Sequence, residues 1–229
     1  MTSLPPIAVF DLDGTLAETA GDLVGTLNVI LAREGLRELP LAEARDMIGA
    51  GAKALIQRGF SAAGQPLPPE TLDRLFADFL IHYGENLCVH SHLYAGVGAA
   101  LDDLSARGYR LAVCTNKIER HAVDLLGLLG VADRFGAICG RETFPFFKPD
   151  PRHITLTIAQ AGGDPARAVM VGDSRADIDA AKAAGIPVIG VTFGYTDTPV
   201  DALGADRVIS HFDDLVGAVD ALVPLDQAA

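Results

Sequence analysis

The chain has 229 residues, of which 49% are hydrophobic and 21% are charged, and its formal net charge is −12. This length and composition predict a globular protein of one or two domains with a sizeable core, and they argue against a disordered chain. The negative charge argues against binding to the phosphate backbone of nucleic acid and to anionic membrane surfaces.

The first predicted element is a strand at 6–10, where an apolar run stops at Asp11. From 19 to 92 the apolar residues instead repeat at helical spacing, and the proline-rich segment 64–69 interrupts them. Roughly 75 residues of helical pattern are far more than a crossover between two parallel strands needs. We therefore predict a small all-helical domain, 17–92, inserted after the first strand.

After residue 93, short apolar runs alternate with helical patterns. Because these runs are continuous rather than alternating, they indicate strands that are buried on both faces, as in a parallel sheet. The predicted strands are 111–114, 137–139, 168–171, 187–191 and a short edge strand at 208–209. The predicted helices are 97–107, 118–129, 153–161, 174–184 and 212–222. The alternation predicts an α/β fold with an open, mainly parallel Rossmann-like sheet, in a core domain formed by 1–16 and 93–229.

Cysteine usage and the N-terminal segment bear on the compartment. Cys88, Cys114 and Cys139 share no CxxC spacing, so they suggest neither a disulfide framework nor a zinc site, and a reducing compartment fits best. The N-terminal segment has no basic stretch, and no apolar run approaches the roughly 18 residues that span a bilayer. We therefore expect a cytoplasmic protein without a membrane partner, and the sequence leaves open whether it is a monomer or a homodimer.

Polar side chains gather where the predicted strands end. In open α/β sheets, ligands bind outside the carboxyl ends of the strands. Four separate segments converge there, and their side chains are carboxylates, hydroxyls, an amide and ammonium groups. The residues are Asp11, Asp13, Thr15, Thr115, Asn116, Lys117, Lys148, Asp173 and Asp177.

Such a group of side chains suggests phosphoryl transfer. Carboxylates a few Å apart repel one another by on the order of 4 kcal/mol per close pair, so a bound cation or a retained proton has to relieve them. Oxygen ligands favour a hard divalent ion such as Mg²⁺, which binds through few carboxylates and a phosphate. Lys148 adds positive charge for a phosphoryl group, and Thr115 and Asn116, at the start of a helix, offer donors to its oxygens.

The two aspartates that follow the first strand have a chemical interpretation of their own. A carboxylate can attack phosphorus and form an aspartyl-phosphate, and Asp11, the first residue past the strand, is the candidate nucleophile. A second carboxyl group can protonate the leaving oxygen and later take a proton from water, which is the role expected of Asp13. Gly14 next to it permits a tight turn.

The residues with this chemistry resemble a known set of motifs. They are Asp11-Leu12-Asp13-Gly14-Thr15, Thr115-Asn116, Lys148-Pro149 and Gly172-Asp173-Ser174-Arg175-Ala176-Asp177. Together, in this order and each after an apolar run, they resemble the four motifs of the haloacid dehalogenase (HAD) superfamily, and the helical insertion resembles that superfamily's cap of the first type. Finer features resemble the phosphoglycolate phosphatase family, namely Cys114-Thr115-Asn116-Lys117, Ile48-Gly49-Ala50-Gly51 with Arg45 nearby, and Leu93-Tyr94 leading into Gly96-Val97. Ala95 departs from that family, which usually has proline there.

The resemblance implies a role for each motif residue. Mg²⁺ would be held by the side chains of Asp11 and Asp173 and by the backbone carbonyl of Asp13. Asp177 would lie behind these ligands, since at i, i+4 from Asp173 it faces the same way on a helix. The phosphoryl group would be gripped by Thr115 and Asn116, and the nucleophile would be oriented by Lys148. The cap would close over the site as a lid and would set specificity for the leaving group together with nearby core residues, through Arg45, Gly49, Gly51, Lys53 and Lys117.

The expected function is a Mg²⁺-dependent phosphatase that acts on a small phosphorylated metabolite, preferably 2-phosphoglycolate, through an aspartyl-phosphate. The choice of substrate rests on the resemblance. Another small-metabolite phosphatase of the superfamily or a sugar phosphomutase is the alternative, because the core motifs do not separate hydrolysis from transfer to a second hydroxyl group. A phosphorylated signalling module of the receiver type is a remote alternative, against which the long insertion and the spacing of Asp11 and Asp13 argue.

Overall fold

A computed structural model describes residues 4–49, 51–196 and 198–223, so Ala50 of the predicted cap loop lies outside the described residues. Six strands form one sheet in the order β5-β4-β1-β6-β7-β8, and all neighbours run parallel. The strands are β1 (Ile7–Phe10), β4 (Arg110–Cys114), β5 (Ala137–Cys139), β6 (Ala168–Gly172), β7 (Val188–Val191) and β8 (Arg207–Ile209). The predicted α/β fold with an open parallel sheet is confirmed.

Helices cover both faces of this sheet, which explains why its strands are apolar throughout. Ala8 and Phe10 of β1 pack on one face and Ile7 and Val9 on the other, because successive side chains of a strand point to opposite faces. The first face is covered by α5 (Val97–Ala106), α6 (Glu119–Leu128) and α9 (Leu215–Leu222), and the second by α7 (Pro151–Ala161) and α8 (Arg175–Ala184). Short 3₁₀ turns at Ala132–Arg134, Pro165–Arg167 and Phe212–Asp214 lie in the connections.

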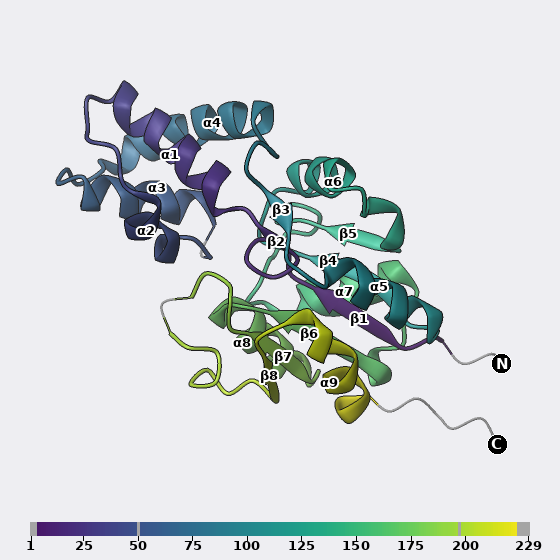
Figure 1. Cartoon of the computed structure of the whole chain (residues 1–229). Coiled ribbons are helices and arrows are strands. Elements are labelled where there is room, and N and C mark those ends of the chain that lie inside the picture. Colours follow the sequence, from purple (N-terminus) through teal and green to yellow (C-terminus); the bar gives the residue numbers. More distant parts are fainter. Residues whose placement is uncertain (1–3, 50, 197, 224–229) are drawn as a thin grey trace, which may run out of the picture.

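The remaining helices form a layer of their own beyond the carboxyl end of β1 (Figure 1). They are α1 (Ala20–Arg33), α2 (Leu41–Ala44), a 3₁₀ turn η1 (Arg45–Met47), α3 (Ala52–Ala62) and α4 (Pro69–Glu85). Their apolar faces share a separate hydrophobic cluster that includes Leu27, Ile56 and Phe79. In the described part of the chain, no helix is both long and apolar enough to cross a membrane.

A short antiparallel ribbon joins the helical layer to the sheet. Its strands are β2 (Ala17–Glu18) and β3 (His92–Leu93), with Ala17 opposite Leu93 and Glu18 opposite His92. The sequence predicted no strand between 19 and 92, yet β3 begins at His92, because a two-residue strand is too short to show a periodic pattern. The predicted domain boundaries, after residues 16 and 92, fall at this ribbon and stay a prediction.

Candidate active site

The loop after β1 turns tightly and carries Asp13. The N–H groups of Leu16 and Ala17 donate to the carbonyl of Leu12 at 3.0 Å, and the N–H of Gly14 donates to the carbonyl of Ala17 at 2.9 Å. Gly14 has φ of +81°, a conformation that favours glycine. The carbonyl of Asp13 takes no part in these turn-closing hydrogen bonds, so it is available to a ligand.

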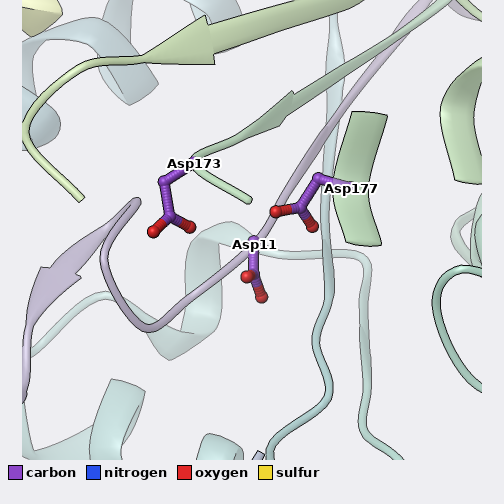
Figure 2. A group of neighbouring side chains, drawn as sticks. All are labelled: Asp11, Asp173 and Asp177. Carbon is purple, nitrogen blue, oxygen red and sulfur yellow. The ribbon is translucent and has the colours of Figure 1, made fainter. Parts of the chain in front are cut away.

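Three carboxylates form a buried cluster (Figure 2). Asp11 follows β1, Asp173 follows β6 and Asp177 lies in the first turn of α8, and one oxygen of each lies within 4.8 Å of the others. Two donors hold the carboxylate of Asp173, the Thr15 hydroxyl at 3.1 Å and the backbone N–H of Tyr195 at 2.6 Å. The sequence therefore predicted correctly that the ends of β1 and β6 bring Asp11 and Asp173 together.

The charges of this cluster call for a cation. Burial raises the pKa of Asp11, and the nearby charge of Lys148 lowers it only in part. Burial and the charge of Asp177 raise the pKa of Asp173 well above its usual range. The Oδ1 atom of Asp11 is buried, and its contact with the ammonium of Lys148 is an ion pair without hydrogen-bond geometry. Oxygen ligands with this much unrelieved negative charge fit a hard divalent cation.

Lys148 lies beside the cluster and is 1% exposed. Its Nζ is 2.6 Å from Oδ1 of Asp177 and 3.0 Å from Oδ1 of Asp11. Burial alone would lower the pKa of Lys148, but the two carboxylates outweigh it and raise the pKa. The backbone N–H of Lys148 donates to Nδ1 of His153 at 3.2 Å, so the ring proton lies on Nε2, 3.1 Å from the carbonyl of Gly140. The sequence analysis did not single out this histidine, which positions the lysine loop.

Asp177 turns toward the cluster for a different reason from the one predicted. The helix α8 begins at Arg175, so Asp173 precedes the helix and the two aspartates are not an i, i+4 pair within it. Asp177 instead accepts hydrogen bonds from the N–H of Ser174 at 3.0 Å and from its hydroxyl at 2.6 Å. This capping box fixes one carboxylate oxygen and leaves the other to Lys148.

Asp13 lies where the sheet edge meets the helical layer. It accepts from Nζ of Lys117 at 2.8 Å and from the Thr19 hydroxyl at 2.8 Å. Lys117 also donates to the hydroxyl of Tyr83 in α4 at 2.6 Å. Burial alone would lower the pKa of Lys117, but Asp13 and Tyr83 outweigh it and raise the pKa. Lys117, predicted as a substrate contact, therefore also holds the candidate acid/base and links it to a cap helix.

Thr115 and Asn116 lie in the loop between β4 and α6. Since α6 begins at Glu119, neither residue is at the start of the helix, which corrects the prediction. The reason is that the N–H of Thr115 still pairs with the carbonyl of Cys139 at 2.9 Å, and the chain then bends at Asn116 and Lys117 before the helix begins. Asn116 donates through Nδ2 to the carbonyl of Lys148 at 2.9 Å, so two of the predicted motifs are directly bonded.

A cavity of about 260 Å³ opens between the sheet edge and the helical layer. Its wall combines polar residues of the strand-end loops with apolar residues of α3 and α4, among them Leu55, Phe76 and Phe79. The predicted site residues that line it are Asp11, Asp13, Gly49, Gly51, Lys53, Thr115, Asn116 and Lys117. The ammonium group of Lys53 is partly exposed and lies 2.6 Å from Asp73.

Arg45 lies elsewhere than the sequence predicted. In the described part of the chain it is not among the residues that line the cavity. Its guanidinium donates to Glu18 at 2.6 Å and to the carbonyl of Phe193 at 3.0 Å, and it lies 4.8 Å from the ring centre of Tyr195. Burial alone would raise the pKa of Glu18, but hydrogen bonds from Tyr195 and Arg45 outweigh it and lower the pKa. The half-buried carboxylate on β2 accounts for the position of Arg45.

Tyr195, after β7, connects the acidic cluster to the helical layer, and the sequence analysis missed it. Besides its N–H contact to Asp173, its hydroxyl accepts from the backbone N–H groups of Thr19 at 2.5 Å and Ala20 at 2.9 Å. A Cβ at the preceding Gly194 would lie 2.2 Å from Cβ of Asp173, so glycine is required for this close approach. The only signal in the sequence is its position just past the end of a predicted strand.

The sequence of this chain is similar to those of known hydrolases over most of its length. Residues 8–191 match the family of haloacid dehalogenase-like hydrolases. A phosphoglycolate phosphatase of Mesorhizobium japonicum is 50% identical over 92% of both chains, and one of Agrobacterium fabrum is 48% identical over 96% of this chain and 95% of the relative.

Solved structures of related proteins have the same fold. The crystal structure of a predicted phosphoglycolate phosphatase from Haemophilus somnus superposes with a TM-score of 0.86 at 33% identity, covering 95% of this chain and 99% of that one. CbbY from Rhodobacter sphaeroides, solved in complex with phosphate, superposes with a TM-score of 0.79 at 26% identity, covering 95% and 100%. The sequence match, the parallel sheet with its helical insertion and the buried aspartates together show that the chain belongs to the haloacid dehalogenase-like hydrolases.

Proposed function

We propose that this protein is a Mg²⁺-dependent phosphatase that hydrolyses 2-phosphoglycolate to glycolate and phosphate. The observation that carries the proposal is the buried cluster of Asp11, Asp173 and Asp177, with Lys148 as its counter-charge. The choice of substrate rests on the relatives named phosphoglycolate phosphatase, which match this chain over nearly its whole length.

In the first step, a carboxylate oxygen of Asp11 attacks phosphorus and the bond from phosphorus to the glycolate oxygen breaks. Asp13 gives its proton to that oxygen, so glycolate leaves as an alcohol and Asp11 carries the phosphoryl group. To reach the leaving oxygen, the Asp13 carboxyl has to exchange its contacts with Lys117 and Thr19 for the substrate.

In the second step, Asp13 takes a proton from a water molecule as that water attacks phosphorus. The bond between phosphorus and Asp11 breaks, inorganic phosphate is released, and Asp13 regains the proton that the next cycle needs. The charge of Lys148, 3.0 Å from Asp11, orients the nucleophile and offsets the negative charge that gathers on the phosphoryl oxygens.

The neighbouring residues hold the phosphoryl group during both steps. Thr115 and Asn116 line the cavity and donate to the phosphoryl oxygens. The side chains of Asp11 and Asp173 and the carbonyl of Asp13 would hold Mg²⁺, which when bound neutralises charge on the phosphoryl group.

The helical layer completes the site. As a lid over the sheet edge, it excludes bulk water from the aspartyl-phosphate and contributes Gly49, Gly51 and Lys53 to the leaving-group side of the cavity. The cytoplasmic location and the monomeric or homodimeric state expected from the sequence stay predictions.

The proposal is tested by phosphate release from 2-phosphoglycolate with Mg²⁺ and after its removal by a chelator. We expect steady turnover only with the metal, and a loss of at least about 10³-fold in kcat for Asp11→Asn, because an amide is a poor nucleophile. Asp179→Asn, which changes an exposed aspartate of α8, is the matched control. Activity of Asp11→Asn close to that of the wild type would contradict the mechanism, and phosphate release that requires a bisphosphate activator would indicate a mutase.

A further inference from the structure

One cationic side chain of the cavity has a position that the sequence motifs do not predict. Arg141 follows β5, and its N–H donates to the carbonyl of Lys117 at 2.9 Å, which holds it at the same sheet edge as the catalytic loops. Its side chain lines the cavity that Asp11 also lines. Its guanidinium lies 3.5 Å from the position that a Cβ at Gly51, another residue of the cavity wall, would take.

Arg141 differs from the other cations of the cavity in its contacts. Lys117 is paired with Asp13 and Lys53 with Asp73. For Arg141, no carboxylate of the described chain lies within ion-pair distance, and its guanidinium rests 3.5 Å from the ring centre of Phe147. An aromatic face holds a guanidinium in place but leaves its N–H edge free to donate.

The surroundings of Arg141 favour an anion. Burial lowers the pKa of Arg141, and the charge of the neighbouring Glu142 offsets this only in part, although arginine stays protonated in proteins. A partly buried cation without a paired carboxylate is unfavourable unless a ligand supplies the opposite charge. A carboxylate is a suitable ligand, because its two oxygens match the fork of the guanidinium.

We propose that Arg141 binds the carboxylate of the phosphorylated acid and so determines the specificity of the enzyme for acids over neutral phosphoesters. The proposal rests on the function proposed above and deepens it. Arg45, which the sequence predicted to contribute to specificity for the leaving group, is instead bound through its guanidinium to Glu18. Since Arg141 belongs to the sheet edge rather than to the lid, its distance from Asp11 does not depend on how far the lid has closed.

The test compares two substrates of the same length, 2-phosphoglycolate and 2-hydroxyethyl phosphate, which has an alcohol in place of the carboxylate. We expect Arg141→Gln to lower kcat/KM for the acid by at least about 30-fold, because removing one partner of a charged pair leaves the other unpaired. We expect its kcat/KM for the alcohol to change by less than about threefold. Arg141→Lys keeps the charge but lacks the bidentate fork, so its kcat/KM for the acid should lie between those of the wild type and Arg141→Gln.

Arg152→Gln is the matched control. The guanidinium of Arg152 also lies over a phenylalanine, 4.1 Å from the ring centre of Phe146, which precedes Phe147 in the chain. Unlike Arg141, however, Arg152 is exposed and pairs with Asp150. This variant should keep the wild-type ratio of kcat/KM for the two substrates.

The possible outcomes separate the two proposals. An equal loss on both substrates by Arg141→Gln, or no loss on either, would overturn the role of Arg141. If the wild-type enzyme hydrolysed a different phosphorylated acid and not 2-phosphoglycolate, only the proposed substrate would be overturned. The role of Arg141 would then be tested by the ratio of kcat/KM for that acid to kcat/KM for its alcohol analogue. A wild-type enzyme without preference for the acid over its alcohol would overturn the Arg141 proposal directly.

Discussion

At the scale of single residues, the acidic cluster depends on a glycine as much as on its aspartates. Gly14 combines φ of +81° with close packing, since a Cβ there would lie 2.5 Å from Oδ2 of Asp173 and 2.9 Å from the ring of Tyr195. A side chain at this position would push Asp173 away from Asp11 and disturb the site for the cation.

We therefore expect Gly14→Ala to lower kcat/KM by at least about 100-fold, since a displacement of about 1 Å in a reacting group has an effect of this size. The variant should also bind Mg²⁺ more weakly, which titration calorimetry measures. Gly35→Ala is the control, because Gly35 has φ of +73° but no atom within 4 Å of an added Cβ. It should cost about 1 kcal/mol of stability and leave turnover unchanged. Equal losses of activity in both variants would mean that backbone strain, and not contact with Asp173, is responsible.

The sequence predicted those residues whose chemistry follows from their position. Asp11 and Asp173 come directly after apolar runs, and parallel strands bring such residues to one edge. Tyr195, His153 and Arg141 were missed because no periodic pattern records their contacts. Tyr195 bonds to Asp173, His153 to the carbonyl of Gly140 and Arg141 to the carbonyl of Lys117.

At the scale of secondary structure, the strands of the sheet were predictable and the connections to the helical layer were not. A strand buried on both faces leaves a continuous apolar run, as at Ala168–Gly172, and glycine and proline end the helices between strands. The ribbon of β2 and β3 leaves no such pattern, yet it carries Glu18, to which the η1 turn of the helical layer is bound through Arg45.

In the structure, Arg45 connects three elements of the chain. It joins η1 to β2 through Glu18 and to the segment after β7 through the carbonyl of Phe193. We expect Arg45→Met to lower kcat/KM for 2-phosphoglycolate and for 2-hydroxyethyl phosphate by the same factor, about tenfold, because a poorly held lid affects every substrate.

Arg37→Met is the matched control for this variant. Arg37 likewise donates to a carboxylate, that of Glu43, and to a carbonyl, that of Ala62, but all three residues belong to the helical layer. The kcat/KM of Arg37→Met should equal that of the wild type for both substrates. If Arg45→Met impaired the acid substrate much more than the alcohol, Arg45 would regain the specificity role that the sequence predicted.

At the scale of the whole molecule, burial of titratable groups makes folding depend on pH. His121 of α6 is 7% exposed, with its ring 5.5 Å from that of Tyr83, and burial together with the charge of Lys117 lowers its pKa to about 4. In the unfolded chain the pKa of histidine is about 6.5. As the pH falls from 6.5 toward 4, the unfolded chain therefore takes up a proton that the folded protein does not, and the free energy of unfolding decreases. Asp11 and Asp173 act in the opposite sense, because their raised pKa values make the folded state bind protons first.

Replacing His121 alone separates its contribution to the pH dependence of the unfolding free energy from that of Asp11 and Asp173. Between pH 7 and pH 5, the wild type should lose about 2 kcal/mol more of its unfolding free energy than His121→Leu does, as measured by urea denaturation. Val123→Ala, on the exposed side of the same helix, should show the pH dependence of the wild type. If His121→Leu and the wild type lost stability in parallel, His121 would be protonated in the folded protein at pH 5. The interface between α4 and α6 would then have to admit a charge next to Lys117, and the close packing of Tyr83 against both residues makes that unfavourable.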